Sequence, residues 1–357
     1  INLMNIQELR IEIDKIDNKI IDLLNKRMNF VNQVGEIKKK NNEPVYRPER
    51  EKEIIDRLSN NSKGKLNYQA IKSIFQEVFA IARNLESEDK ISYLGPEGSF
   101  THQAAENNFG SSSSFISLNS IKAVFESLES DKSKFGIIPL ENNQEGIVQE
   151  TIDMLGSSDL SIVAEMSMSI SFVFASKCKS VSEVEKVYSK DIAFKQCKNF
   201  IEEYFDESIQ LVPVGSTSRA VSTANKTKNS GAICSRIAAV EKGLPILFNK
   251  IENSSKNHTR FIVLSKNHSN KKSGNDKTSV LVRLPDGHGV LANFLQEFHN
   301  AKINLTKLES RPAREGTDFK YVFYIDFEGH YLDNNFQIIL KRYEDNIKIL
   351  GSYVRLI

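Results

Sequence analysis

The sequence predicts a protein of three domains, an all-helical one followed by two of mixed α/β structure. Residues 6–38 hold apolar side chains at intervals of three and four, the spacing of a helix with one buried stripe. From residue 91 onward, short apolar runs alternate with helical stretches, which indicates strands covered by helices. Beyond residue 278 the element order is βαββαβ, the ferredoxin-like arrangement. We place the domains at 1–89, 90–270 and 278–357, with a flexible polar linker at 265–277.

Composition excludes several classes of protein. The chain has 357 residues, 39% of them hydrophobic and 26% charged, which is globular material with room for two or three cores. A net charge of +2 argues against a nucleic-acid partner. No apolar stretch approaches the roughly 18 residues that span a membrane, and the N-terminus does not resemble a signal peptide, so we expect a cytoplasmic protein with no membrane partner. Three widely spaced cysteines and no metal-ligand spacing predict neither disulfides nor a metal site.

The first helix is too long to be covered by its own domain. It would run about 50 Å at 1.5 Å per residue, so we expect another copy of the chain to lie along it. The segment "NNEP" (41–44) ends this helix, Pro48 opens a second over 48–58, and residues 66–85 form a third.

Two cations stand in the apolar stripe of this helix. Arg27 and Lys38 project within about 20° of each other near its centre. An unpaired buried cation costs several kcal/mol, so both must meet anions. Arg10 points about 100° away and could reach the same place only from another chain or by a bent path. A dimeric bundle with interhelical ion pairs and a pocket for a small dianion both satisfy this pattern.

The order and spacing of five charged residues in the helical region resemble the all-helical chorismate mutases. They are Arg10, Arg27, Lys38, Arg50 and Glu51. The resemblance implies an interlocked dimer in which Arg10 of the partner chain and Arg27 hold the two carboxylates of chorismate. It implies that Lys38 donates to the ether oxygen, while Arg50 and Glu51 line the site and Glu51 accepts from the ring hydroxyl. Such a rearrangement needs a compact conformer and positive charge at the breaking bond, not a nucleophile or a cofactor.

Three positions depart from the commonest pattern of that family. Arg47 stands where aspartate is frequent, Ala82 where serine is, and Glu86 where a glutamine usually donates to the ether oxygen. A carboxyl group donates a hydrogen bond only when protonated. We therefore expect mutase activity to fall as Glu86 ionises with rising pH.

The middle region places polar side chains at strand ends and helix starts. "GPEGSFTHQAA" (95–105) is a Gly-rich turn before a helix, and four similar segments follow at intervals along the chain. The side chains concerned are hydroxyls, amides and charged groups, with no Ser-His-Asp order among them. They are Thr101, Glu141, Asn142, Ser189, Gln196, Ser216, Thr217, Thr259 and Arg260.

Together these segments resemble the prephenate dehydratases, in order, across about 180 residues. The resemblance implies two α/β lobes around a cleft, like a type 2 periplasmic binding protein. In the "TRF" motif, Thr259 would hydrogen-bond the departing hydroxyl and Arg260 would orient or bind a substrate carboxylate. Thr101, Asn142, Ser189, Gln196, Ser216 and Thr217 would complete the pocket. Formation of an aromatic ring drives the step, so hydrogen bonds that strengthen as the hydroxyl leaves are sufficient.

Two segments of the dehydratase pattern are altered. Lys190, Asp191 and Ile192 replace a usual His-Pro-Gln, and Asn143 replaces the serine of a usual Glu-Asn-Ser. The first change puts a cation and an anion at a loop of the expected cleft.

Two motifs of the C-terminal region mark a candidate effector site. "GVLA" begins a helix whose free N–H groups can take a carboxylate, and the "NLTKLESRP" segment lies at the neighbouring strand. With these motifs the region resembles the ACT domains of phenylalanine-sensitive dehydratases. The resemblance implies that phenylalanine binds between two such domains, with its ring on Val290 and Leu291; Val290 and Ala292 depart modestly from the usual motif. The expected effector residues are Gly289, Val290, Leu291, Ala292, Asn304, Leu305, Glu309, Ser310, Arg311 and Pro312. A domain that serves oligomerisation alone is the alternative.

The sequence thus predicts a cofactor-independent bifunctional enzyme that converts chorismate to prephenate and then to phenylpyruvate under feedback by phenylalanine. We expect a homodimer or homotetramer. An arogenate dehydratase, or a non-catalytic sensor of small aromatic anions, fits the same motifs. Sequence leaves open the activity of the altered mutase pocket, channelling between sites and the affinity for phenylalanine.

Overall fold

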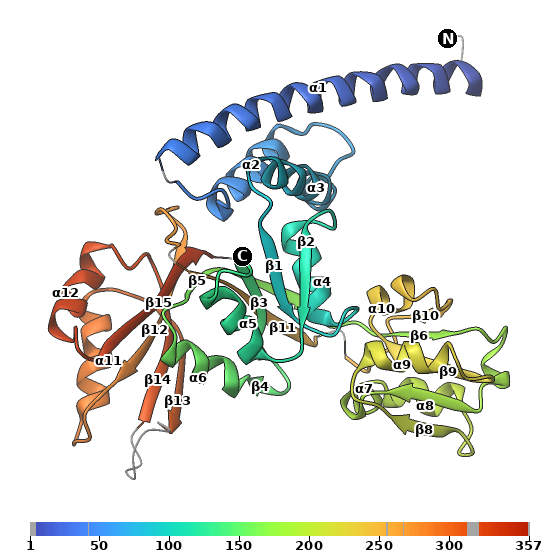
Figure 1. The fold of residues 1–357 in the computed structure, drawn as a ribbon. Coiled ribbons are helices and arrows are strands. Elements are labelled where there is room, and N and C mark those ends of the chain that lie inside the picture. The colour runs from blue at the N-terminus through green and yellow to red at the C-terminus, as the bar shows by residue number, and fades with distance from the viewer. Residues whose placement is uncertain (1–4, 42, 255, 267, 313–320, 356–357) are drawn as a thin grey trace. The chain divides into compact units, whose positions relative to one another are not determined.

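Figure 1 shows the computed structural model of the chain, which describes residues 5–41, 43–254, 256–266, 268–312 and 321–355. The chain forms two compact units, Ile1–Asp89 with Phe109–Ser114, and Lys90–Asn108 with Phe115–Ile357. Within the described ranges, no helix combines the length and apolar composition needed to cross a membrane.

The first unit is helical, as predicted. Its helices are α1 (Ile6–Asn41), α2 (Pro48–Asn61) and α3 (Tyr68–Glu86). The side chain of Asn67 caps α3 by accepting a 2.9 Å hydrogen bond from the backbone N–H of Ala70. The ring of Phe109 packs on Tyr46 with centroids 5.0 Å apart, so this short segment belongs to the helical unit although it lies beyond residue 89 in the chain.

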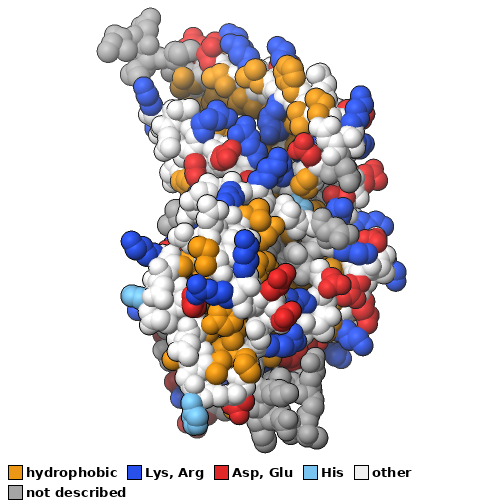
Figure 2. Space-filling model, turned by 90° about the vertical axis from the view of Figure 1, so that its left-hand side faces the viewer, with side chains coloured by type: hydrophobic (Ala, Val, Ile, Leu, Met, Phe, Trp, Pro, Cys, Tyr) orange, Lys and Arg blue, Asp and Glu red, His pale blue; other side chains and the backbone are white. Residues whose placement is uncertain are grey.

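Helix α1 leaves most of its apolar stripe uncovered. Among the described residues of α1, only Gly35 is buried. It lies against α3, so closely that a Cβ at this position would be 3.1 Å from Cγ of Glu86. Figure 2 shows hydrophobic side chains gathered over this long helix at the top of the view. The apolar residues of α1 with the largest exposed fractions, between 53% and 69%, are Ile6, Ile11, Ile13, Ile16, Ile21, Leu23, Phe30 and Ile37. Exposed apolar surface of this kind is typical of an interaction site.

The second unit begins with a sheet of order β2-β1-β3-β11-β5, with β4 paired to β3. Its strands are β1 (Lys90–Leu94), β2 (Ser114–Leu118), β3 (Phe135–Asn142), β4 (Gly146–Ile147), β5 (Ser161–Ser169) and β11 (His258–Ser265). Its helices are α4 (Phe100–Phe109), α5 (Ile121–Glu129) and α6 (Gln149–Ser157). Strand β11 runs antiparallel between β3 and β5, so a segment distant in sequence occupies the interior of this sheet.

A second sheet has the order β10-β6-β9-β7-β8. Its strands are β6 (Val173–Ser176), β7 (Lys186–Ser189), β8 (Gln210–Pro213), β9 (Ser230–Cys234) and β10 (Ile246–Asn249). The accompanying helices are η1 (Val181–Glu183), α7 (Asp191–Gln196), α8 (Lys198–Tyr204), α9 (Thr217–Ala224) and α10 (Arg236–Glu241). The apolar run "SISFVFA" (169–175) is not one strand, because between Ser169 and Val173 the chain leaves the first sheet for the second.

The third sheet confirms the predicted βαββαβ order, with strands arranged β13-β14-β12-β15. Its elements are β12 (Asp276–Arg283), α11 (Val290–Asn300), β13 (Leu305–Pro312), β14 (Tyr321–Glu328), α12 (Asn334–Arg342) and β15 (Ile347–Val354). The helices bury Phe294, Phe298, Phe336 and Ile339 against this sheet.

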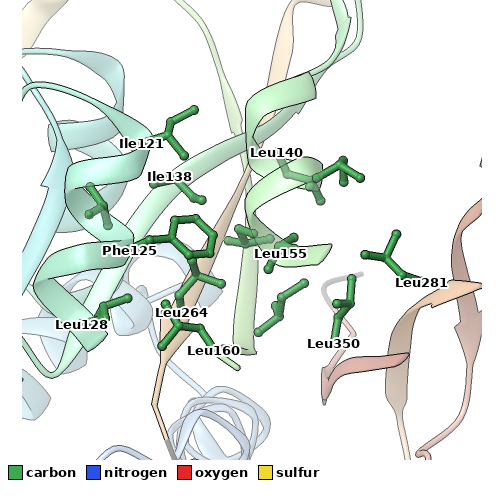
Figure 3. Packing of buried hydrophobic residues seen from close by; sticks show 14 of the residues in the cluster. Ile121, Phe125, Leu128, Ile138, Leu140, Leu155, Leu160, Leu264, Leu281 and Leu350 are labelled. Carbon is green, nitrogen blue, oxygen red and sulfur yellow. The ribbon is translucent and has the colours of Figure 1, made fainter. Parts of the chain in front are cut away.

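The other face of the third sheet packs on the first sheet's domain. Leu281 and Leu350 join the apolar cluster that contains Leu155 and Leu160 (Figure 3). Gly351, at φ 153°, lets β15 approach β5 so closely that a Cβ would overlap the carbonyl oxygen of Ile162.

The segment predicted as a flexible linker is tied to both domains. Asn270 is 7% exposed, and its amide donates to the carbonyl oxygens of Val163 at 2.7 Å and Ser352 at 2.9 Å. The polar composition of this segment suggested a solvated linker. The side chain of Asn270 instead satisfies buried backbone carbonyl groups.

Candidate active sites

A cavity of about 460 Å³ lies among the three helices of the first unit. Apolar side chains and nine charged ones, which include both stripe cations, form its walls. The lining residues are Arg27, Phe30, Val31, Val34, Lys38, Val45, Arg47, Glu49, Arg50, Glu51, Glu53, Ile54, Phe79, Ala82, Arg83 and Glu86. The structure therefore brings together five of the six predicted mutase residues, and Arg10 is not among those that line the cavity.

Arg27 has a buried donor to spare. Its Nη1 is inaccessible to solvent and has no hydrogen-bond partner, and its guanidinium lies 5.7 Å from the ring centroid of Phe79. Burial lowers the pKa of Arg27, while the carboxylates of Glu51 and Glu86 act in the opposite direction. A half-buried cation with a buried, unused donor suits an anionic ligand.

Lys38 is held at the far side of the cavity. Its ammonium donates to Oε2 of Glu86 at 2.8 Å and to the carbonyl oxygen of Val45 at 3.2 Å. The carboxylate of Glu86 is 8% exposed, so this ion pair is largely removed from water. Glu86 thus competes with any ligand for the same ammonium.

Sequence reasoning did not single out Arg83. It is 9% exposed, donates to Glu51, and donates to the carbonyl oxygen of Phe109 at 2.7 Å. Burial raises the pKa of Glu51, and Arg83 opposes that shift. Its position in the sequence could have revealed it. Arg83 is a cation that follows the apolar residues Val78, Phe79 and Ala82 on the buried face of α3, where an unpaired charge is costly.

The remaining mutase residues lie at the margins. Arg50 donates to Glu53 at 2.9 Å and its side chain is 62% exposed. Arg47, which replaces the usual aspartate, donates to the buried carboxylate of Glu49 at 2.5 Å.

The second site joins the ends of β3 and β11. Thr259 pairs in register with Asn142, and Nδ2 of Asn142 donates to Oγ1 of Thr259 at 2.8 Å. Because the threonine accepts in this contact, its own O–H remains available for donation. Thr259 is 8% exposed.

A chain of amides extends from this pair. Asn142 also donates to Asn257 at 2.8 Å, Asn257 donates to Gln196 at 3.2 Å, and Gln196 donates to Gln144 at 3.3 Å. The structure thus unites Thr259, Asn142 and Gln196. It adds Asn257 and Gln144, which sequence reasoning missed although "NHTRF" begins at Asn257.

Other predicted residues lie outside that chain of amides. Ser189 is fully buried and donates to the carbonyl oxygen of Ile233 at 2.7 Å. Ser216 caps α9 by accepting from the N–H of Arg219 at 3.0 Å, and Thr217 is the first residue of that helix. Thr101 is the second residue of α4 and is 5% exposed.

Arg260 is directed toward acidic side chains. Its Nη2 donates to Oδ2 of Asp326 at 3.0 Å, and its Nε lies 3.7 Å from both Glu141 and Glu165. Successive side chains of a strand point to opposite faces, so this guanidinium and the hydroxyl of Thr259 lie on different sides of β11. The geometry differs from that expected of a ligand for a substrate carboxylate beside Thr259.

The Gly-rich turn before α4 is held by hydroxyls of the second sheet's domain. Ser218 donates to the carbonyl oxygen of Glu97, and Ser235 donates to that of Gly98 at 2.6 Å. Gly98 has φ 77°, and a Cβ there would lie 2.9 Å from Ala238.

Among the described residues, one group offers ligand atoms for a metal ion: His102, Glu106 and Glu241, within 4.8 Å of one another. However, Nδ1 of His102 accepts from the N–H of Gly98 at 3.2 Å, and its ring stacks on Tyr93 with centroids 4.7 Å apart. These contacts give the imidazole a structural role.

The predicted effector residues fall on two segments of the third sheet's domain. Gly289, at φ 74°, precedes α11, where Val290 and Leu291 are half-buried. Strand β13, at the sheet edge, carries the second segment. On it, Arg311 is 9% exposed and its Nη1 is buried without a partner.

Comparisons with known proteins cover both units. The sequence model of the prephenate dehydratase family matches residues 91–269, and that of chorismate mutase type II matches residues 9–87. A prephenate dehydratase from Arthrobacter aurescens, solved in complex with L-Phe, is 29% identical, with a TM-score of 0.68 over 74% of this chain and 90% of that one.

Similarity to bifunctional relatives extends over nearly the whole chain. The bifunctional chorismate mutase/prephenate dehydratase of Aquifex aeolicus is 38% identical over 355 residues, which are 98% of this chain and 97% of the relative. That of Pseudomonas aeruginosa is 32% identical over 357 residues, with the same coverage. The chain therefore belongs to the family of bifunctional chorismate mutase/prephenate dehydratases.

Proposed function

We propose that this bifunctional enzyme makes phenylpyruvate from chorismate by way of prephenate, and that L-phenylalanine inhibits the second step. The observation that carries the proposal is the cavity of the helical unit, in which Arg27 and Lys38 meet among apolar walls. The same chain continues into a dehydratase domain, so the product of the first reaction is the substrate of the second.

In the mutase site, Arg27 takes a carboxylate of chorismate through its unused Nη1. Lys38 donates to the ether oxygen, where negative charge develops as the C–O bond breaks and the new C–C bond forms. The apolar walls favour the compact conformer in which the two reacting carbons are close. Glu51, held by Arg83, accepts from the ring hydroxyl.

A second copy of the chain completes this site. The exposed apolar surface of α1 needs cover, and an antiparallel α1 of a partner would supply it over its full length. That partner's Arg10 then provides the cation for the second carboxylate. We propose a homodimer, or a homotetramer built from such dimers.

In the dehydratase site, the reaction breaks the bond from the ring to a carboxylate, which leaves as carbon dioxide. Its electron pair enters the ring, and the C–O bond to the hydroxyl breaks. Thr259 donates its free O–H to the departing oxygen, and Asn142 fixes the orientation of Thr259. The hydrogen bond strengthens as charge grows on that oxygen, so it favours the transition state over the bound substrate.

Phenylalanine is proposed to bind at the segments 289–292 and 304–312, between two copies of the C-terminal domain. The free N–H groups at the start of α11 suit its carboxylate. The relative from Arthrobacter aurescens, solved with L-Phe, supports this choice of effector.

The test follows chorismate, prephenate and phenylpyruvate by NMR in the presence of the purified protein. Wild type should yield phenylpyruvate, Thr259→Ala should accumulate prephenate, and Arg27→Ala should leave chorismate but still consume added prephenate. Saturating phenylalanine should slow the second step. Prephenate that binds but is not consumed by the wild type would instead favour a sensor, and faster turnover of arogenate would reassign the substrate.

A further inference from the structure

The two strands that carry the dehydratase pair present opposite faces to different surroundings. Thr259 and Asn142 are cross-strand partners, and so are the residues beside them, Arg260 and Glu141. Thr259 and Asn142 contact each other on one side, while the charged pair points to the other side. Arg260 and Glu141 are therefore the immediate chain neighbours of the two site residues.

Three strands of the C-terminal domain bring charges to that other side. Lys277 of β12 contacts Glu165 of β5 at 2.5 Å and Asp326 of β14 at 3.6 Å. Asp326 is fully buried, and it pairs with Arg260. Lys307 of β13 contacts Oε1 of Glu141 at 2.5 Å, with its side chain 15% exposed. Three cations and three carboxylates thus meet where the two domains join.

Lys307 stands inside the segment 304–312 proposed to bind phenylalanine. Residues on both sides of it in that strand, Leu305 and Glu309, are expected effector residues, whereas its own ammonium reaches the dehydratase domain. Among the described residues, six ion pairs make up this cluster. Only the pair of Lys307 with Glu141 joins the segment 304–312 to a chain neighbour of Asn142 or Thr259.

We propose that Lys307 is a positioning residue for the dehydratase site, which holds Asn142 and Thr259 in place through Glu141, and that phenylalanine acts by changing this contact. The regulatory half rests on the proposed function. The positioning half does not depend on phenylalanine, because it rests only on the ion pair between Lys307 and Glu141.

The contact suits this role because it is short, charge-assisted and mostly removed from water. Such pairs constrain geometry more than exposed ones do. An effector can shift an equilibrium only as far as its affinities for the two states differ. Phenylalanine bound around β13 favours one placement of Lys307. The state in which Lys307 contacts Glu141 and the state in which this contact is broken therefore bind phenylalanine with different affinities.

The experiment compares Lys307→Gln, Lys307→Arg and Glu141→Gln in the full chain. The matched control is Lys348→Gln, because Lys348 of β15 also reaches the dehydratase domain, donating to the carbonyl oxygens of Gly156 at 3.1 Å and Ser158 at 2.5 Å, away from β3 and β11. Chorismate mutase activity of the same preparation reports that the helical unit is folded, and near-UV circular dichroism reports the packing of the second unit. Prephenate turnover is measured with and without phenylalanine, and phenylalanine binding by calorimetry.

Without phenylalanine, Lys307→Gln and Glu141→Gln should each lower kcat for prephenate about tenfold with KM little changed, within the range that a small misplacement causes. The double variant should be no worse than either single one, because both remove the same contact. Lys307→Arg should restore most of kcat. With phenylalanine, Lys307→Gln should still bind the effector but lose the inhibition, while Lys348→Gln keeps both.

Normal kcat and normal inhibition in Lys307→Gln would overturn the proposal and leave the proposed function intact. A tenfold loss of kcat in a protein whose wild type ignores phenylalanine would uphold positioning and refute the proposed feedback. A loss in Lys307→Gln matched by Lys348→Gln would also overturn it, because any interdomain contact would then serve.

Discussion

The ammonium of Lys38 donates a 2.8 Å hydrogen bond to the carboxylate of Glu86 across the mutase cavity. Both groups line the space where a breaking ether bond would need a donor. The pair neutralises the cation on which the proposed mechanism depends, and ionised Glu86 cannot itself donate.

Replacing Glu86 by Gln should therefore raise mutase activity at neutral pH by roughly tenfold. The amide can donate a hydrogen bond and no longer neutralises the charge of Lys38. Initial rates of chorismate loss at neutral pH measure this, with Glu36→Gln as control, since Glu36 is exposed on α1 and meets Lys39 only at 4.0 Å. A variant slower than wild type would contradict the role given to Glu86.

Arg83→Met should destabilise the helical unit by about 2–3 kcal/mol, because it leaves the partly buried carboxylate of Glu51, 22% exposed, without its cation. Thermal unfolding measures the loss, and mutase activity should fall with it. Adding Glu51→Gln should recover part of the stability but none of the activity, since the amide removes the uncompensated charge and also the acceptor for the ring hydroxyl. Full mutase activity in Arg83→Met would show that the ion pair is dispensable.

Asn257→Ala should lower dehydratase kcat about tenfold, the effect of one lost buried hydrogen bond on the barrier. Asn257 is 2% exposed and connects Asn142 to Gln196, so its loss frees the amide that holds Thr259. Asn225→Ala is the control, because the amide of Asn225 donates to a backbone carbonyl elsewhere in the second sheet's domain. Equal kinetics in the two variants would remove Asn257 from the site.

Sequence predicted the helical first unit and the βαββαβ order of the third sheet because helical and strand periodicities are local properties. It predicted Arg27 and Lys38 at one cavity because charges on a buried face are anomalous in any sequence. Glu86 was assigned to that cavity by the family resemblance alone. It could not place Arg260, since which face of a strand meets another domain depends on packing between distant segments. Asn270 was assigned to a flexible linker for the same reason: its burial depends on Val163 and Ser352, which are far away in the chain.

Asp326→Asn should destabilise the second unit at neutral pH by about 3–5 kcal/mol, because Arg260 and Lys277 lose a buried partner. Burial disfavours the charge of Asp326, but Lys277 and Arg260 outweigh it, so the pKa of this carboxyl lies below its usual value. A lowered pKa gives stability that is complete above the unfolded value of about 3.9 and is lost as pH falls through the folded value.

Acid unfolding of that variant should accordingly depend less on pH below about 4 than that of wild type. Asp131→Asn is the control: Asp131 is 77% exposed beside Lys266, and Asn tolerates its positive φ of 54°. Identical acid profiles for Asp326→Asn and wild type would show that the carboxylate contributes nothing to stability.

Two inactive chains should restore mutase activity to each other if Arg10 acts from a partner. Arg10 lies near the start of α1, outside the residues that line its own chain's cavity, while Lys38 lines that cavity. In a mixed dimer of Arg10→Ala and Lys38→Ala chains, one cavity has both cations and the other has neither. Unfolding and refolding the two variants together should therefore give activity that neither shows alone, measured as chorismate loss. Dehydratase activity of each variant, which depends on another domain, reports correct refolding. If the mixture stays as inactive as its components, Arg10 acts within its own chain or not at all, and the uncovered stripe of α1 would then need a different occupant.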